Sequence, residues 1–591
     1  MSDQTNSRRR FLKVMPVAVA GAVASKVLAQ GQGPTGPITA DTVDCAGKIA
    51  GIDFHTSEEE AIARSLNSNL STYQQLRQVE IPTDTPPAIS FHPCLPTRQP
   101  KGPATPGRPV RYSKPAPGAV RRPANLEDVA FWPVARLAAL IERRLVTSTE
   151  LTKMYLDRLK KHGPTLFAVV TLTEDLALQQ AADADRAIAG GRYKGPLHGV
   201  PWGAKDLFAT KGIRTTFGAE PYVDQVIDYD ATVVERLRDA GAVLVAKLSM
   251  GALAQGGVWF GGSTRNPWNT QQSSSGSSAG PGAATAAGLV AFALGTETRG
   301  SIISPSAANG VVGLRPTYGR VSRYGAMELS WTMDKVGPMC RYVEDCVLVL
   351  NAIYGPDGRD ETVADAGFTW DPALPLSSLR IGYVRNDFEE SAGRGGRGGG
   401  ARGGAGGGRG GRGGADAQQQ AAERLKLMQE VLAVYRKLGA KLEPVDLPNT
   451  IPANALGFIL SVESAAAFDD LTRSRGIDIM RNSSWPATFR SNRFVPAVEY
   501  IRAQRIRTLL MQEWDKFMGQ YDAFISSNSA GLAATNLTGH PAIALKCGFQ
   551  NNMPRPLMVT GRLYEEARIC RIAMAYEQAT EWKDRHPSLG N

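Results

Sequence analysis

The chain has 591 residues, of which 42% are hydrophobic and 21% are charged, a composition typical of a globular protein with a large apolar core. Its formal charge of +11 comes mainly from residues 1–29, which contribute +4, and from residues 391–415, which contribute +5. The remaining residues carry only +2, so the composition gives no reason to expect an extended basic surface for nucleic acid.

The first residues are typical of a targeting segment rather than of a folded element. SRRRFLK (Ser7–Lys13) has the twin-arginine pattern, and an apolar run over residues 14–25 precedes the small residue Ala29 at a cleavage position. The run is too short to span a bilayer, so no stable membrane insertion is expected. We expect residues 1–29 to be a signal peptide for the twin-arginine export machinery, which makes the mature protein periplasmic or secreted. The alternative is a disordered basic N-terminus.

Residues 30–125 are rich in proline, glycine and threonine, which predicts an extended linker or a wrapping arm. They include Cys45 and Cys94, and a disulfide between these two is compatible with an oxidising compartment. The other cysteines are expected to be buried thiols. Neither the cysteines nor the six histidines show the spacing of a metal site, so no metal and no cofactor are expected.

Helix and strand patterns alternate over residues 126–591. Apolar residues recur with helical spacing over 132–162, where Ser148 or Thr149 is expected to cap the second helix. Helical stretches further along lead into short apolar runs typical of strands, such as AVLVAKLSM (242–250). This alternation predicts an α/β fold in which helices cover both faces of a sheet.

A segment rich in glycine and arginine, at about 391–417, interrupts this pattern. It follows the strand-like LRIGYVRNDFEE and precedes an amphipathic helix that leads to another strand. The segment cannot form a packed core, so we expect a disordered insert in a loop, and a long loop costs little additional closure entropy. RGG repeats can bind RNA, but an exported protein meets little RNA, so no nucleic-acid partner is expected.

Residues 272–310 form a second compositional outlier, rich in glycine, serine and alanine. Two turns of small residues contain Ser277 and Ser301, and the apolar stretch between them predicts a buried helix followed by a strand. Each serine, taken alone, could be an ordinary loop residue. A serine nucleophile needs a base, and no histidine is close in sequence. Lys205, in the apolar LHGVPWGAKDLF, is a candidate because burial lowers the pKa of a lysine. The alternative is a surface lysine paired with Asp206.

These segments together resemble the amidase signature family. GSSAGPGAATAAGL and ALGTETRGSI resemble the signature, and GPLHGVPWGAKDLF resembles the lysine motif that precedes it. The resemblance extends over about residues 128–585, apart from the glycine-rich insert. It implies an amidase-signature α/β/α sandwich, in which helices cover both faces of a large mixed β-sheet, and hydrolysis of carboxylic amides.

The resemblance also implies a Ser–cisSer–Lys triad. It gives Ser301 the role of the acylated nucleophile, Ser277 that of the bridging serine after a cis peptide bond, and Lys205 that of the base. Its oxyanion hole corresponds here to the backbone N–H groups of Thr298, Arg299, Gly300 and Ser301. Ser278 and Glu297 occupy positions that support the triad.

The nucleophile loop departs from the family pattern Asp-x-Gly-Gly-Ser-Ile-Arg. Glu297 replaces the aspartate, Arg299 replaces the first glycine, and Ile303 replaces the arginine. Only the backbone N–H of residue 299 is needed in the hole, so a side chain is tolerable if its φ avoids the region reserved for glycine. The sequence leaves open whether Arg299 replaces the missing partner of Glu297 or reaches into the substrate pocket.

The expected function is that of an exported amidase that cleaves a small amide or an amidated peptide through an acyl-serine. An amidase fold that binds a ligand without turnover is an alternative from another class. A glutaminase-type amidotransferase subunit is a further alternative, which the export signal disfavours. An RNA-associated protein acting through the RGG insert is the weakest alternative. The sequence is compatible with a monomer and with a homodimer.

Overall fold

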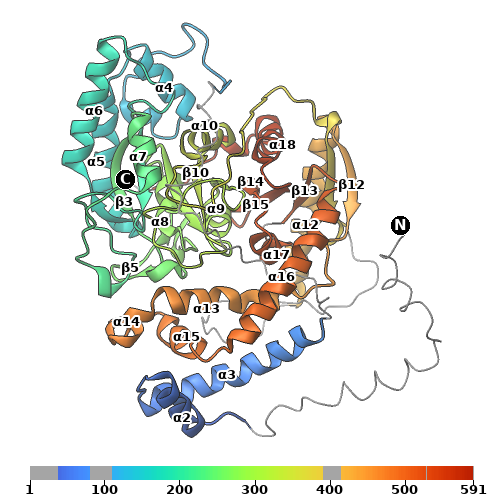
Figure 1. Ribbon diagram of the computed structural model, residues 1–591. Helices are drawn as coiled ribbons and strands as arrows, with labels where there is room; N and C mark the ends of the chain where they lie inside the picture. Colours follow the sequence, from blue (N-terminus) through green and yellow to red (C-terminus); the bar gives the residue numbers. More distant parts are fainter. Residues whose placement is uncertain (1–36, 80–109, 390–413, 528, 590–591) are drawn as a thin grey trace, which may run out of the picture. The chain divides into compact units, whose positions relative to one another are not determined.

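The computed structural model describes residues 37–79, 110–389, 414–527 and 529–589 (Figure 1). The predicted signal peptide, Cys94 and most of the glycine-rich insert lie outside these residues. The chain divides into two units, residues 1–71 and residues 72–591.

The first unit contains α2 (Ala40–Ala50) and most of α3 (Thr56–Arg77). The Thr39 side chain caps α2 by accepting a hydrogen bond from the Thr42 amide, and Gly51 ends it with φ of +67°. An extended linker or arm was predicted here, and that prediction is wrong for these residues. The prolines that suggested it lie outside residues 38–81, so nothing in this stretch prevents a helix.

Residues 110–125 contain no helix or strand, and side chains attach them to later parts of the second unit. The Ser113 amide donates to Glu344 Oε1 at 2.9 Å, and Arg122 forms an ion pair with Glu150 at 2.7 Å. This stretch therefore lies along the domain as an arm.

The second unit contains most of the helices. They are α4 (Val134–Glu142), α5 (Ser148–Leu166), α6 (Glu174–Ala189), α7 (Thr232–Asp239), α8 (Ala279–Ala286), α9 (Ile303–Asn309), α10 (Val343–Ile353), α11 (Arg385–Phe388), α12 (Gly414–Lys437), α13 (Phe458–Ala467), α14 (Asp469–Arg473), α15 (Trp485–Asn492), α16 (Ala497–Met518), α17 (Leu532–Leu537) and α18 (Glu566–Ala579). Short 3₁₀ helices are η2 (Leu126–Val129), η3 (Glu220–Tyr222), η4 (Ala252–Ala254), η5 (Leu376–Ser378), η6 (Ala453–Gly457), η7 (Gly476–Ile479) and η8 (Trp582–Asp584).

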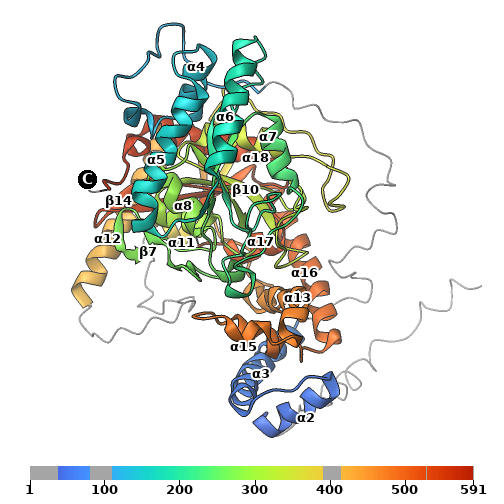
Figure 2. The same cartoon turned by 90° about the vertical axis from the view of Figure 1, so that its left-hand side faces the viewer.

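The cap of α5 lies one residue before the predicted position. Thr147 accepts from the Glu150 amide while the Glu150 carboxylate accepts from the Thr147 amide, which completes a capping box. Ser148 is instead the first helical residue, and its hydroxyl donates to Gly199 O at 2.8 Å. In Figure 2, α5 and α6 lie side by side, in agreement with their packing.

An eleven-stranded mixed sheet forms the centre of the second unit, in the order β1-β3-β2-β8-β10-β9-β14-β15-β13-β11-β12. Its strands are β1 (Val169–Leu172), β2 (Pro201–Lys205), β3 (Val243–Leu248), β8 (Phe292–Glu297), β9 (Val312–Arg315), β10 (Lys335–Cys340), β11 (Arg380–Val384), β12 (Lys441–Val445), β13 (Ala523–Ser526), β14 (Ala542–Gln550) and β15 (Met553–Gly561). Two small hairpins pair β4 (Val258–Trp259) with β5 (Gly262–Ser263), and β6 (Arg265–Asn266) with β7 (Asn269–Ser273). Strands β2, β3 and β8 run parallel, whereas β10 pairs antiparallel with β8 and β9.

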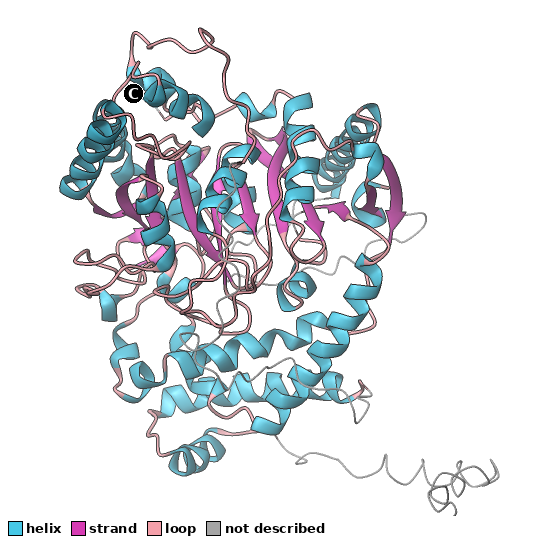
Figure 3. Cartoon of the chain, turned by 45° about the horizontal axis from the view of Figure 1, so that its top comes forward, coloured by secondary structure: helices cyan, strands magenta, loops and turns pink. Residues whose placement is uncertain are grey.

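Helices cover both faces of this sheet (Figure 3). Phe292 and Leu294 of β8 pack in the same apolar cluster as residues of α10, whereas Ala293 between them packs with residues of α8. Successive side chains of a strand point to opposite faces, so α8 and α10 lie on opposite sides. The predicted α/β sandwich with a large mixed sheet is confirmed.

The glycine-rich insert falls between two paired strands. β11 and β12 are parallel neighbours, and α12, the helix that connects them, begins at Gly414. The insert thus lies within a β–α–β crossover, before its helix, as the sequence predicted.

Candidate active site

Lys205, the last residue of β2, is fully buried. Its ammonium contacts three hydroxyls: Ser277 Oγ at 2.8 Å, Thr296 Oγ1 at 2.9 Å and Ser278 Oγ at 3.1 Å. Burial lowers the pKa of Lys205 to about 7, although Asp334 and Glu297 oppose the change. Lys205 can therefore exchange a proton near neutral pH.

The alternative in which Lys205 is a surface residue paired with Asp206 is wrong. Asp206 instead pairs with Lys247 at 3.3 Å. Both partners of that pair are fully buried.

Ser277 is held by a close approach of two backbone segments. The Gly276–Ser277 peptide bond is cis, as the family resemblance implies. A Cβ on Gly276 would lie 1.8 Å from Gly256 O, so only glycine fits at this position. The Ser278 amide donates to Ser301 O at 3.2 Å, which joins the turn containing Ser277 to the nucleophile loop.

Ser301 lies just beyond the carboxyl end of β8 and is half-buried. Gly300 before it has φ of +118°, a conformation that favours glycine. Arg299 does not have a positive φ, which explains why an arginine is accepted where the family has glycine. Among the described residues, no acceptor receives the backbone N–H groups of Arg299, Gly300 and Ser301, and the Ser301 hydroxyl makes no hydrogen bond.

Glu297 is fully buried and holds the nucleophile loop through hydrogen bonds. Its Oε2 accepts from the Ile302 and Ile303 amides, both at 2.9 Å. Its Oε1 accepts from Arg315 and Asn536, also at 2.9 Å each. Burial raises the pKa of Glu297, but Arg315, Lys335 and the amide donors outweigh it, so the pKa lies below its usual value and the carboxylate is charged.

Arg315, the last residue of β9, is therefore the ion-pair partner of Glu297. Arg299 does not have this role. Its guanidinium lies against η6, where Nη2 contacts Asn454 Oδ1 at 3.3 Å.

Comparisons with known proteins agree on one family. The family model described as Amidase matches residues 150–395. The glutamyl-tRNA(Gln) amidotransferase subunit of Methylococcus capsulatus is 33% identical over 505 residues, which cover 77% of this chain and 98% of the relative. The corresponding subunit of Moorella thermoacetica is 34% identical over 517 residues, which cover 78% and 99%. The chain belongs to the amidase signature family.

A solved structure extends this similarity to three dimensions. The native peptide amidase from Stenotrophomonas maltophilia is 28% identical, with a TM-score of 0.65, over 78% of this chain and 99% of that chain. The protein is thus an amidase signature hydrolase. Over the described residues, no group of three or more His, Cys, Asp or Glu side chains could hold a metal ion. Within the same ranges, no helix is long and apolar enough to cross a membrane.

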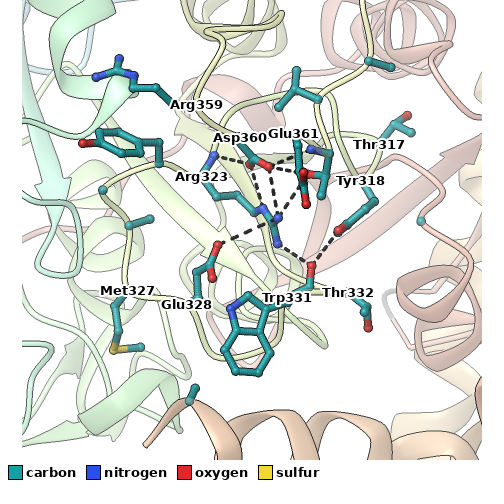
Figure 4. Close-up of a pocket in the computed structure, with 18 of the residues that line it drawn as sticks. Thr317, Tyr318, Arg323, Met327, Glu328, Trp331, Thr332, Arg359, Asp360 and Glu361 are labelled. Carbon is teal, nitrogen blue, oxygen red and sulfur yellow. Dashed lines mark hydrogen bonds and ion pairs between the residues drawn. The ribbon is translucent and has the colours of Figure 1, made fainter. Parts of the chain in front are cut away.

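The second unit also contains a cavity of about 1630 Å³ (Figure 4). Arg323 lines it and donates to Asp360 Oδ2 at 3.0 Å and to Trp331 O at 2.6 Å. Exposed side chains of Tyr229, Tyr324 and Trp331 contribute to its wall. The residues that line this cavity do not include Lys205, Ser277 or Ser301.

One loop connects the cavity to the oxyanion region of the amidase. Trp331 lines the cavity, and Asp334, three residues later, accepts from Thr298 Oγ1 at 2.5 Å. Asp334 also accepts from the Leu329 amide at 2.7 Å and from the Ser330 amide at 2.9 Å. The loop is thus tied directly to a residue of the predicted oxyanion hole.

Sequence reasoning missed Thr296, Arg315, Asp334 and Asn536. Arg315 could have been found, because a charged residue that ends the apolar run VVGL needs a buried partner. Thr296 and Asn536 carry no such signal, since their roles depend on the pairing of distant strands. Cys45 is an exposed thiol, and its proposed partner Cys94 lies outside the described residues. The remaining cysteines are buried, as predicted.

Proposed function

We propose that this protein hydrolyses carboxylic amides through a covalent acyl-serine, with Ser301 as nucleophile, Ser277 as proton bridge and Lys205 as base. The observation that carries the proposal is the buried 2.8 Å contact between Lys205 Nζ and Ser277 Oγ, next to a loop that presents Ser301. A base without charge near neutral pH and a chain of hydroxyls are what activation of serine requires.

In the acylation step, neutral Lys205 accepts the Ser277 proton while Ser277 accepts the proton of Ser301. The Ser301 oxygen bonds to the carbonyl carbon, and the carbonyl π electrons move to its oxygen. The backbone N–H groups at Thr298, Arg299, Gly300 and Ser301 are the proposed donors to this oxyanion.

The intermediate collapses when the carbonyl re-forms and the C–N bond breaks. The proton held by Lys205 returns through Ser277 to the leaving nitrogen, so the amine departs neutral and the acyl group remains on Ser301. Water then attacks the ester with the same groups in the same roles. The products are a carboxylic acid and an amine or ammonia, and no other reactant is consumed.

The substrate proposed is a small external amide or an amidated peptide. The structural neighbour at 28% identity is a peptide amidase, which supports peptide amides within this class. The twin-arginine pattern of Ser7–Lys13 supports a periplasmic or secreted enzyme.

A panel of amides offered to the purified protein tests this function. Release of ammonia or amine is measured for aliphatic, aromatic and peptide amides, with Ser301→Ala as the matched control. Turnover by the native protein and none by Ser301→Ala is expected. Equal release by both proteins would contradict the role of Ser301 as nucleophile, and binding of amides without release would favour the ligand-binding alternative.

A second candidate is glutaminase activity within an amidotransferase, because the curated relatives at 33–34% identity are amidotransferase subunits. The same panel addresses it when glutamine is included. Hydrolysis of glutamine in preference to every other amide would favour this candidate.

A further inference from the structure

Arg299 is a cation beside the proposed nucleophile, and its charge is not used within the fold. Its side chain is only partly exposed, and among the described residues it forms no ion pair. Its contact with Asn454 Oδ1, at 3.3 Å, is to a neutral amide. Arg315, by contrast, is fully buried and paired with Glu297. The structural requirement for a guanidinium under the loop is thus already met by Arg315.

The backbone and the side chain of Arg299 lie in different environments. Its backbone N–H is one of the proposed oxyanion-hole donors, two residues before Ser301, so the side chain starts beside the proposed nucleophile. Its side chain extends over η6, where a Cβ on Gly457 would lie 2.5 Å from Nη1. The side chain is therefore held against η6 by packing and by Asn454, which orients the guanidinium.

A guanidinium that is partly desolvated and lacks a carboxylate partner favours an anion from outside the chain. Burial lowers the pKa of Arg299, and no acidic group in the described structure acts in the opposite direction. A carboxylate matches the two parallel N–H groups of a guanidinium and forms charge-assisted hydrogen bonds with it.

We propose that Arg299 determines specificity by binding a carboxylate of the substrate, so that the preferred substrates are amides carrying a negative charge. This inference rests on the proposed function of the site. The carboxylate can belong to the acyl part, as in a monoamide of a dicarboxylic acid, or to the amine part, as in an N-acyl amino acid. In either part of the substrate, the carboxylate would lie close to the bond that is cleaved, and therefore within reach of the Arg299 side chain.

Two matched pairs of substrates test the inference and identify the source. The acyl-side pair is the 4-nitroanilide of glutaric acid and its methyl ester. The amine-side pair is N-butyryl-4-aminobenzoate and its methyl ester. For each pair, the ratio of kcat/KM for the charged substrate to kcat/KM for the neutral ester is compared between the native protein and Arg299→Met.

The ratio for one pair should fall about 10- to 100-fold in Arg299→Met, the loss expected for charge-assisted hydrogen bonds. Arg299→Lys should retain part of the ratio, because the charge remains while the bidentate geometry is lost. Arg121→Met, at an exposed arginine of the arm, is the matched control and should leave both ratios unchanged. The pair that responds identifies the part of the substrate that carries the anion.

The outcomes separate this inference from the proposed function. If the native protein cleaves the anilides but both ratios are the same in Arg299→Met, the carboxylate role is overturned and the amidase function stands. If the native protein cleaves neither these four substrates nor any amide of the panel, the amidase function fails. Calorimetric binding of the two charged amides to Ser301→Ala, with and without Arg299→Met, then decides the carboxylate role. Loss of binding with Arg299→Met supports it, and equal binding overturns it.

Discussion

The burial of Lys205 links the fold directly to the pH range of the proposed chemistry. Lys205 acts as a base only when it is neutral, and its pKa is lowered to about 7. The neutral fraction therefore increases as the pH rises through this value, so kcat/KM should rise through about pH 7 and then level off. A pH profile of a good substrate measures this. A profile that still rises near the ordinary lysine pKa of about 10.4 would contradict it.

Substitution of the three triad residues should give graded losses. Ser301→Ala should abolish turnover and labelling by a phosphonate, and its thermal midpoint should match the native one because the hydroxyl makes no hydrogen bond among the described residues. Lys205→Ala should lower kcat/KM by about 10⁴-fold or more, since no other base contacts Ser277 among the described residues. Ser277→Ala should be milder than Ser301→Ala, because a water can replace the bridging hydroxyl. Phosphonate labelling of Ser301→Ala equal to that of the native protein would disprove the assignment.

Glu297 and Arg315 should contribute to the stability of the fold as a pair, so that the effects of substituting them are not additive. Glu297→Gln leaves the buried Arg315 without its counter-ion, which should lower the free energy of unfolding by about 3–5 kcal/mol. Glu297→Gln combined with Arg315→Met removes both charges and should recover part of this loss. Chemical denaturation measures both values. A double variant less stable than Glu297→Gln alone would show that Arg315 stabilises the fold through other contacts.

For single residues, the sequence predicted which side chains belong to the site better than it predicted which side chains contact one another. Family motifs pointed to Lys205, Ser277 and Ser301, and the structure brings Lys205 and Ser277 into contact. The partner of Glu297 could not be predicted, because Arg315 belongs to β9, which is separated from β8 by β10 in the sheet. An ion pair between strands that are not neighbours can be predicted only after the strand order is known.

At the scale of elements, the crossover from β11 to β12 should tolerate loss of the insert. Replacing residues 393–413 with a short Gly–Ser linker keeps β11, α12 and β12 intact, and closing a loop of different length changes the free energy of folding little. Amide hydrolysis should stay within a few-fold of the native rate. The thermal midpoint is the control, and a collapse of activity or of solubility would show that the insert packs on the domain or gates the site.

The order and type of most elements were accessible from the sequence, whereas some details of local structure were not. The buried helix α8 and the strand β8 followed from the apolar, Ala-rich pattern of their sequences. Helices α2 and α3 were missed because prolines outside residues 38–81 dominated the average composition of residues 30–125. The α5 cap was displaced by one residue because Thr147, Ser148 and Thr149 are all acceptable caps, and Glu150 at the third helical position decides among them.

For the whole molecule, the twin-arginine pattern predicts export and processing. Replacing Arg8 and Arg9 with lysine should retain the full-length protein in the cytoplasm. The native protein should be found in the periplasm or medium with Gln30 as its first residue. Cell fractionation and N-terminal sequencing measure both outcomes. Native protein that stays cytoplasmic with residues 1–29 attached would contradict the prediction.

A cut in the crossover between β11 and α12 would divide the amidase into two polypeptides. Lys205, Ser277 and Ser301 all precede residue 389, whereas Asn536 and strands β13, β14 and β15 follow residue 414. Neither polypeptide can complete the sheet alone, because β14 must pair with β9 and β13 with β11. A chain cut at this crossover and attached to two interacting proteins should therefore report their association through the proposed amide hydrolysis.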